Sequence, residues 1–472
     1  MPLNLNQIPY IPKQIYTCKL HDFTVLYNPY SYRGILIINA KAKKIFHSIN
    51  GKNNLKKIIN TNKNILTETV IMSLFKQLIN YHIVSFSQSQ NTKLRISYRS
   101  FSAIKSLSLW IHLTNQCNFR CTYCFVDKNN ITFTKKKIDK LLTMLIPLQK
   151  KYHYKSIRFL LAGGEPLSRF SLVRHIVKKA AFYKKTYQIP INLSIITNGS
   201  LITEEYARFF KQHRIKIGVS LDGIGESNDQ TRKFPDGKGT FKYTERGLQI
   251  LQQLGVLFNV SATITMNNVY NLHTLVMYCL KQKIPISLEF FAKLNDLCKE
   301  EVITEERQFI EQYKKILTTI YKYYFDHNLL YSPLKHNNLL HPLRILHHSY
   351  YESCLGGLNY FSIFPNGTVR FCAASDMAIA SLDSKDFVKE AKKNYLMLFK
   401  NAMPDDIKEC QQCLWRYNCA GGCKLERLII DKKAPSVKCG IYKELIPFII
   451  KLEAQRIINL NMFLISKRNI DN

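Results

Sequence analysis

The chain has 472 residues, of which 46% are hydrophobic and 21% charged, so it can bury two or three cores and is not a disordered protein. No apolar run reaches the roughly 18–20 residues that a membrane span needs, and no secretory signal is visible, so we expect a cytoplasmic protein without membrane contact. The 68 basic and 33 acidic residues give a net charge of +35. This charge indicates either an anionic partner or a lysine-rich composition in which the lysines only solvate the surface.

Residues 1–95 are predicted to form a small domain of their own. They alternate between extended and amphipathic helical patterns, and the Asn50-Gly51 pair is a turn signal. The order of these elements indicates a winged-helix-like domain, and the polar stretch Ser87–Ser97 is a linker to the next domain. The predicted elements are strands at Ile15–Tyr27, Arg33–Ile38 and His82–Phe86, helices at Ala40–Ile49 and Thr67–Tyr81, and a short Lys-rich helix after the Asn50-Gly51 turn.

Residues 105–300 alternate between strand and helix, which predicts an α/β domain built on a parallel sheet, either open or curved into a partial barrel. The predicted strands are Leu107–Leu113, Ile157–Leu161, Asn192–Ile196, Lys216–Leu221, Leu257–Thr265 and Ser287–Phe291. The predicted helices are Lys137–Lys151, Leu172–Tyr187, Glu204–His213, Phe241–Leu254 and Leu272–Lys283.

The alternation stops near residue 300, and three further segments complete the chain. Residues 301–350 contain a predicted helix, Thr304–Tyr324, and a histidine-rich bridge, His336–His348. Residues 351–445 are dense in cysteine, and residues 446–472 form the end of an apolar C-terminal helix and a tail.

Cys117, Cys121 and Cys124 lie close together just after the first predicted strand of the α/β domain. Three thiolates on one loop can bind three irons of a [4Fe–4S] cluster and leave the fourth iron open to a ligand. A zinc loop or three buried structural thiols are the alternatives, although zinc sites prefer a fourth ligand nearby in sequence.

This spacing, CxxxCxxC with an aromatic residue before the last cysteine, resembles the radical S-adenosylmethionine (SAM) superfamily. Three further motifs match in the family's order: Gly-Gly-Glu-Pro after the second strand, Thr-Asn-Gly after the third and Ser-Leu-Asp-Gly after the fourth. The resemblance implies a (β/α)6 partial barrel in which reductive cleavage of SAM yields a 5′-deoxyadenosyl radical. The residues that it places at SAM are Tyr123, Gly163, Gly164, Glu165, Asn198, Ser220 and Arg232, with Glu165 at the methionyl amine.

The second cysteine module resembles the SPASM domain of radical SAM peptide maturases, which carries two auxiliary [4Fe–4S] clusters. The resemblance assigns Cys354, Cys372 and Cys423 to auxiliary cluster I, and Cys410, Cys413, Cys419 and Cys439 to auxiliary cluster II. Cluster I then lacks a fourth thiolate. Either His347 or His348 serves as the fourth ligand, or one iron of the cluster is open. Sulfatase maturases carry an Asp where this chain has Ala373, which argues against that activity.

Residues 1–95 resemble, by the order of their elements, the recognition element of enzymes that modify ribosomal peptides. In that family the leader of a precursor peptide adds a strand to the edge of a three-stranded sheet. Residues 1–100 contain 14 basic residues against two acidic ones, so we expect a leader rich in Asp and Glu. A structural cap on the barrel is the alternative interpretation.

Together these features predict an oxidoreductase that cross-links side chains in the core of a precursor peptide through thioether, ether or carbon–carbon bonds. Its cofactors are SAM and three [4Fe–4S] clusters, and its electrons come from a flavodoxin- or ferredoxin-type donor. A sulfatase-maturase-like protein oxidase and a radical SAM enzyme acting on RNA are the alternatives, although a nucleic-acid substrate would not explain a SPASM module. No catalytic acid or base can be named from the sequence.

Overall fold

The computed structural model describes residues 3–31, 33–86, 106–291, 305–327, 329, 354 and 356–468, with side chains up to residue 461. The predicted linker Ser87–Ser97, the histidine-rich stretch His336–His348 and Cys298 lie outside the described residues. Among the described helices, none is both long and apolar enough to cross a membrane.

The N-terminal segment contains an antiparallel sheet in the order β1-β2-β3, with three helices after it. Its elements are β1 (Tyr16–Leu20), β2 (Phe23–Tyr27), β3 (Ile35–Ile38), α1 (Ala40–His47), α2 (Leu55–Asn62) and α3 (Glu68–Asn80). The stretch predicted as one strand, Ile15–Tyr27, is a hairpin that turns at His21, whose φ is 52°. The predicted strand His82–Phe86 is wrong: His82 has a left-handed φ of 56°, and only Ser85 forms a bridge, to Tyr10.

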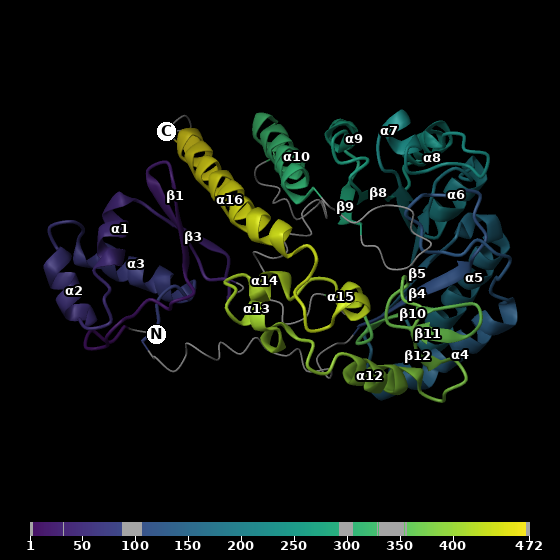
Figure 1. Cartoon of the computed structure of the whole chain (residues 1–472), viewed down its shortest axis with the longest axis horizontal. Helices are drawn as coiled ribbons and strands as arrows, with labels where there is room; N and C mark the ends of the chain where they lie inside the picture. The colour runs from purple at the N-terminus through teal and green to yellow at the C-terminus, as the bar shows by residue number, and fades with distance from the viewer. Residues whose placement is uncertain are drawn as a thin grey trace.

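The two faces of this sheet pack against different parts of the molecule because side chains alternate along a strand. Leu26 of β2 belongs to a core shared with α1, α2 and α3. Val25 and Tyr27, on the opposite face, belong to the main core of the molecule. The N-terminal segment is therefore packed onto the remainder of the chain through one face of its sheet (Figure 1).

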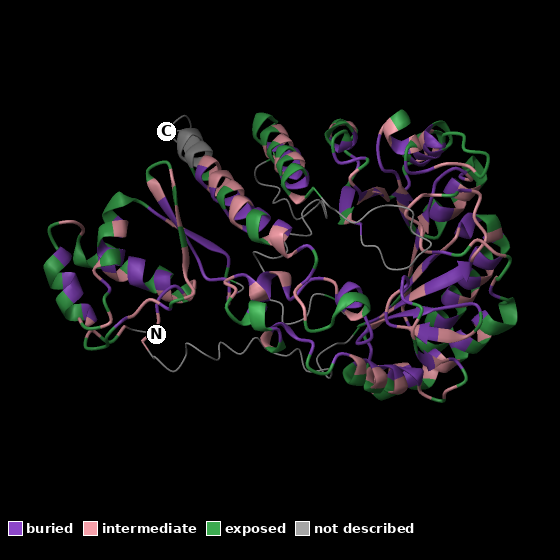
Figure 2. Ribbon diagram, in the orientation of Figure 1, coloured by how far each residue is buried: buried purple, intermediate pink, exposed green. Residues whose placement is uncertain are grey.

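The α/β segment is built on six parallel strands that follow one another in sequence and in space, as predicted. These strands are β4 (Ser106–Thr114), β5 (Ser156–Gly163), β6 (Ile191–Thr197), β7 (Lys216–Ser220), β8 (Phe258–Ile264) and β9 (Ile286–Phe290). The connecting helices are α4 (Lys135–Tyr152), α5 (Phe170–Tyr187), α6 (Glu204–Gln212), α7 (Glu226–Asp229), α8 (Phe241–Gln253) and α9 (Leu272–Lys281). Figure 2 shows the strands as largely buried, with exposed residues on the outer sides of the helices.

The cysteine-rich segment extends this sheet, which the sequence did not predict. Strand β10 (Tyr360–Ile363) pairs in parallel with β4, and β11 (Thr368–Arg370) and β12 (Ala378–Ser381) continue antiparallel to make nine strands. The barrel and the cysteine-rich segment therefore share one sheet and one core. Helices of this segment are α12 (Phe387–Leu398), α13 (Lys408–Gln411), α14 (Arg416–Cys419) and α15 (Lys424–Ile430).

Two long helices lie between the N-terminal sheet and the barrel in Figure 1. Helix α10 (Glu306–Asp326) packs along α16 (Cys439–Arg468), and Asn459 of α16 donates a 2.7 Å hydrogen bond to the hydroxyl of Tyr321. Helix α16 also contacts β1 and β3, so it links the N-terminal sheet to the main core.

Candidate functional site

The four sequence motifs gather at one edge of the sheet because the carboxyl ends of parallel strands meet there. The loop with Cys117, Cys121 and Cys124 follows β4, and the Gly-Gly-Glu, Thr-Asn-Gly and Ser-Leu-Asp-Gly motifs follow or end β5, β6 and β7. Ser220 is the last residue of β7 and is half-buried. The sequence motifs therefore converge on one end of the barrel.

The Gly163–Gly164 turn lies directly against the chain that leads into the cysteine loop. The amide of Gly164 donates to the carbonyl of Thr114 at 2.6 Å, and that of Glu165 donates to the carbonyl of Gln116 at 2.7 Å. A Cβ at Gly164 would lie 2.1 Å from the Gln116 oxygen, and Gly163 has a φ of +131°. Only glycine allows this approach, which fixes the start of the cysteine loop.

The carboxylate of Glu165 is fully buried and joins the loops after β5 and β6. It accepts hydrogen bonds from the Thr197 hydroxyl at 2.7 Å, the Asn198 amide at 2.8 Å and the Leu167 amide at 2.9 Å. Burial raises the pKa of Glu165 to about 7, against the effect of these donors. Its carboxylate thus stabilises the loops, and its predicted contact with the methionyl amine stays a prediction.

Asn198 connects the loop after β6 to the cysteine loop. Its side chain donates to the Asn118 oxygen at 2.9 Å and accepts from the Ser200 hydroxyl at 2.7 Å. Asn118 in turn donates to the Ser200 hydroxyl at 2.9 Å. These three side chains form a closed polar triangle next to Cys117 that holds the two loops in register.

Asp222 is the residue of this site that sequence reasoning missed. It is fully buried and accepts from the Tyr123 hydroxyl at 2.5 Å, Arg232 Nε at 2.7 Å and the Thr263 amide at 2.9 Å. Burial acts to lower the pKa of Arg232, but Asp222, Tyr123 and Cys121 together raise that pKa above its ordinary value. Arg232 Nη1 also lies 3.9 Å from the Cys121 sulfur, so Asp222 positions two predicted SAM-site residues at the cysteine loop.

The three thiols of the loop have cationic and amide donors around them. Lys128 Nζ lies 2.9 Å from the Cys124 sulfur, and the Phe119 amide donates to the Cys117 sulfur at 3.4 Å. Burial raises the pKa of Cys121 to about 12, and Arg232 acts against that increase. Thiols that interact with one another and face Lys128 and Arg232 can be held as thiolates by bound iron, so this donor set fits a cluster.

The cysteines of the second module form two separate groups in the structure. Cys372 interacts electrostatically with Cys354 and Cys423, and burial raises its pKa to about 12. A second group surrounds Cys419, whose pKa burial also raises to about 12. The partners of Cys419 in that group are Cys410, Cys413 and Cys439. The two groups have the same members as the two predicted ligand sets.

In the described part of the chain, no three Cys, His, Asp or Glu side chains converge closely enough to bind a single metal ion. The thiolates of a four-iron cluster bind different irons, so they need not converge on one point as zinc ligands do. The all-thiol donor sets therefore suit clusters. The ligand role of these cysteines stays a prediction, and His347 and His348 lie outside the described residues.

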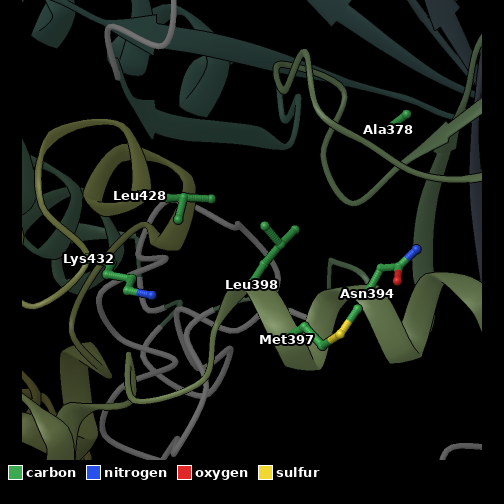
Figure 3. A pocket seen from close by; sticks show the side chains of 6 residues that line it. All are labelled: Ala378, Asn394, Met397, Leu398, Leu428 and Lys432. Carbon is green, nitrogen blue, oxygen red and sulfur yellow. The ribbon is translucent and has the colours of Figure 1, made fainter.

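A cavity of about 450 Å³ lies between α12 and α15 (Figure 3). Its lining residues are Ala378, Asn394, Met397, Leu398, Leu428 and Lys432. It contains none of the predicted site residues.

Comparisons with known proteins agree with this geometry. The family model "Radical SAM superfamily" matches residues 111–278. The uncharacterized protein MJ0907 of Methanocaldococcus jannaschii is 30% identical over 46% of this chain and 71% of its own. A cysteine-type anaerobic sulfatase-maturating enzyme of Clostridium novyi is 26% identical over 68% of this chain and 88% of its own.

Two further similarities extend over more of the chain. The radical SAM cyclopropyl synthase TigE of Paramaledivibacter caminithermalis is 22% identical over 87% of this chain and 93% of its own. The crystal structure of Streptococcus suis SuiB bound to precursor peptide SuiA has a TM-score of 0.51 at 15% identity, over 91% of this chain and 99% of SuiB. The chain belongs to the radical SAM superfamily and is an enzyme, and that family implies SAM and a [4Fe–4S] cluster as its cofactors.

Proposed function

We propose that the chain binds the leader of a ribosomal precursor peptide through residues 1–95 and forms side-chain cross-links in the core of that peptide. The observation that carries this proposal is the position of the N-terminal sheet against the second cysteine group. Asn418, next to Cys419, donates to the Tyr27 hydroxyl at 2.7 Å, and the Trp415 ring lies 5.0 Å from that of Tyr16. A peptide bound to this sheet is thus held close to the cysteine-rich segment.

The N-terminal sheet has the features that strand addition requires. Among the described strands, none pairs with the outer edges of β1 or β3, so either edge can accept an extended peptide. Backbone pairing supplies affinity, and the basic side chains of the segment favour an acidic leader. SuiB, which is similar in fold over most of this chain, is a precursor-peptide-binding protein, and this supports the proposal.

Within this proposal, the described residues have three roles. Cys117, Cys121 and Cys124 would hold the cluster that supplies the electron for SAM cleavage. Asp222 fixes Arg232 and Tyr123 beside that loop. Cys354, Cys372 and Cys423 would hold auxiliary cluster I, and the second group auxiliary cluster II, as acceptors for the electron released on bond closure.

The atom balance of a cross-link defines its test. Hydrogen abstraction from one side chain and closure on another remove two hydrogens from the peptide, one as 5′-deoxyadenosine and one as a proton plus an electron. The test is anaerobic incubation with SAM, a reductant and a precursor peptide encoded beside the gene for this chain. The mass of the peptide should fall by two hydrogens per cross-link, and only while the leader is attached to the core. A mass change that is equally large without the leader would contradict the recognition role of residues 1–95.

Sulfatase maturation is the second candidate, because relatives with that name match most of their own length. Ala373, which is buried, stands where those enzymes are expected to carry an Asp. Incubation with a peptide containing a sulfatase cysteine motif distinguishes the two activities. Conversion of that cysteine to formylglycine, with no effect on a precursor peptide, would favour this candidate.

A further inference from the structure

Arg427 is a buried cation in the middle of the cysteine-rich segment. It lies one turn after Cys423, the residue that caps α15, and its side chain is only 2% exposed. A Cβ added to Gly421 would lie 3.4 Å from its guanidinium carbon. The guanidinium therefore packs against the loop between Cys419 and Cys423.

The hydrogen bonds of Arg427 do not neutralise its charge. It donates to the carbonyl oxygens of Ala402 at 2.7 Å and Lys432 at 3.1 Å. Its buried Nε has no hydrogen-bond acceptor, and no carboxylate pairs with it, among the residues that the structure describes. A buried charge without a counter-charge costs several kcal/mol, so the compensating negative charge must come from another group.

The cysteine thiols are the groups that can supply this charge. Burial lowers the pKa of Arg427, and Cys410, Cys423 and Cys419 raise it. The loop that packs against the guanidinium runs from Cys419 of one group to Cys423 of the other, so the guanidinium lies beside both groups. The nearby Glu426 is already paired with Lys438 at 2.5 Å, and so it does not compensate Arg427.

We propose that Arg427 is a positioning residue that raises the reduction potentials of both auxiliary clusters. This inference rests on the proposed function in so far as the seven SPASM cysteines hold those clusters. A four-iron core bound by thiolates is an anion and gains a further negative charge on reduction, so a buried cation favours the reduced form. A raised potential makes each auxiliary cluster a better acceptor for the electron released on bond closure.

The test uses the full chain with Cys117, Cys121 and Cys124 changed to Ala, so that only the auxiliary clusters contribute to the signal. Arg427→Met in this background removes the charge and keeps the length of the side chain. Potentiometric titration followed by electron paramagnetic resonance should show the reduction equilibrium of each cluster falling about tenfold, which corresponds to about 59 mV for a one-electron couple. Lys432→Met is the matched control, because it removes an equal charge from an exposed side chain and leaves the carbonyl that Arg427 uses.

The outcomes separate this inference from the proposed function, since the titration needs neither peptide nor SAM turnover. Unchanged potentials at full iron content would overturn the role of Arg427, and a shift in only one cluster would overturn its action on both. If Arg427→Met fails to incorporate iron, Arg427→Gln keeps an amide donor for Ala402 and carries the same expectation. If the chain with Cys117, Cys121 and Cys124 changed to Ala binds no iron, the inference is overturned together with the assignment of the auxiliary clusters, while SAM cleavage by the wild type still supports the SAM-binding cluster.

Discussion

His112 on β4 illustrates how burial sets the charge of a single side chain in the barrel. It is 1% exposed, stacks on Phe364 with ring centroids 4.6 Å apart, and donates from Nε2 to Asn115 at 2.8 Å. Burial is the main cause that lowers the pKa of His112 to about 4, and the nearby Lys128 and Arg370 contribute in the same direction. The imidazole is therefore neutral in the folded chain at pH 7.

This pKa predicts a dependence of stability on pH. Between pH 6.5 and 4 the unfolded chain binds a proton at this histidine and the folded chain does not, so stability is lost as the pH falls through that window. Between pH 6.5 and 4, the free energy of unfolding of the wild type should fall by about 3 kcal/mol more than that of His112→Phe. Chemical denaturation at a series of pH values measures both. The exposed His153→Asn is the control and should follow the wild type; equal slopes for wild type and His112→Phe would contradict the buried, neutral state.

Asp222 supplies the counter-charge of Arg232, so its removal should be costly. Asp222→Asn leaves a buried guanidinium without a full partner and should reduce the free energy of unfolding by about 3–5 kcal/mol. Asp236→Asn, which breaks an exposed pair with Lys238, is the matched control and should have little effect in the same denaturation experiment. Equal effects of the two variants would mean that the buried pair does not stabilise the site.

At the scale of elements, the sequence predicted the six barrel strands to within two residues, because short apolar runs are bounded there by clear turn signals. The sequence could not predict β10–β12, which are three or four residues long and are stabilised by pairing with β4. The site divides in the same way. Its cysteines and glycines are recognisable from the sequence by their spacing. The role of Asp222 is not recognisable from the sequence, where it belongs to a turn motif, because two of the groups that donate to it, the Tyr123 hydroxyl and the Thr263 amide, come from distant segments.

The close approach of the Gly163–Gly164 turn to the cysteine loop can be tested at one atom. Gly164→Ala places a methyl group against the Gln116 carbonyl and should displace the loop, reducing the iron bound at Cys117, Cys121 and Cys124. Gly218→Ala in β7 is the control, because its Cβ would meet no atom closer than 3.7 Å. Iron content and SAM binding are measured for both variants after anaerobic reconstitution. A full complement of iron in Gly164→Ala would contradict the close approach.

At the scale of the whole molecule, the N-terminal sheet is in contact with the cysteine-rich segment, and under the proposed function this contact would join peptide recognition to chemistry. Trp415 packs against Tyr16 and Tyr27, and Arg416 lies 5.1 Å from the centre of the Tyr30 ring. One face of the sheet is therefore occupied by the enzyme, whereas its strand edges are available to a leader. Under the proposed function, recognition and catalysis would thereby be held in a fixed spatial relation.

This arrangement predicts that the contact of Trp415 with the N-terminal sheet can be removed without loss of leader binding. Trp415→Ala should leave the affinity for the leader nearly unchanged and reduce the rate of cross-linking, because the bound peptide is then no longer held in one position relative to the barrel. Tyr187→Ala, at an exposed aromatic residue of α5, is the control and should change neither quantity. A loss of leader affinity in Trp415→Ala that accounts for the whole loss of rate would contradict this separation.

Counting iron together with 5′-deoxyadenosine tests most directly whether the chain is a radical SAM enzyme with one SAM-binding and two auxiliary clusters. The reconstituted wild type should contain roughly 12 irons per chain, from three four-iron clusters, and should form 5′-deoxyadenosine from SAM. Changing Cys117, Cys121 and Cys124 together to Ala should leave about eight irons and abolish 5′-deoxyadenosine formation. Continued formation of 5′-deoxyadenosine by that variant, or a wild type with only about four irons, would contradict the account.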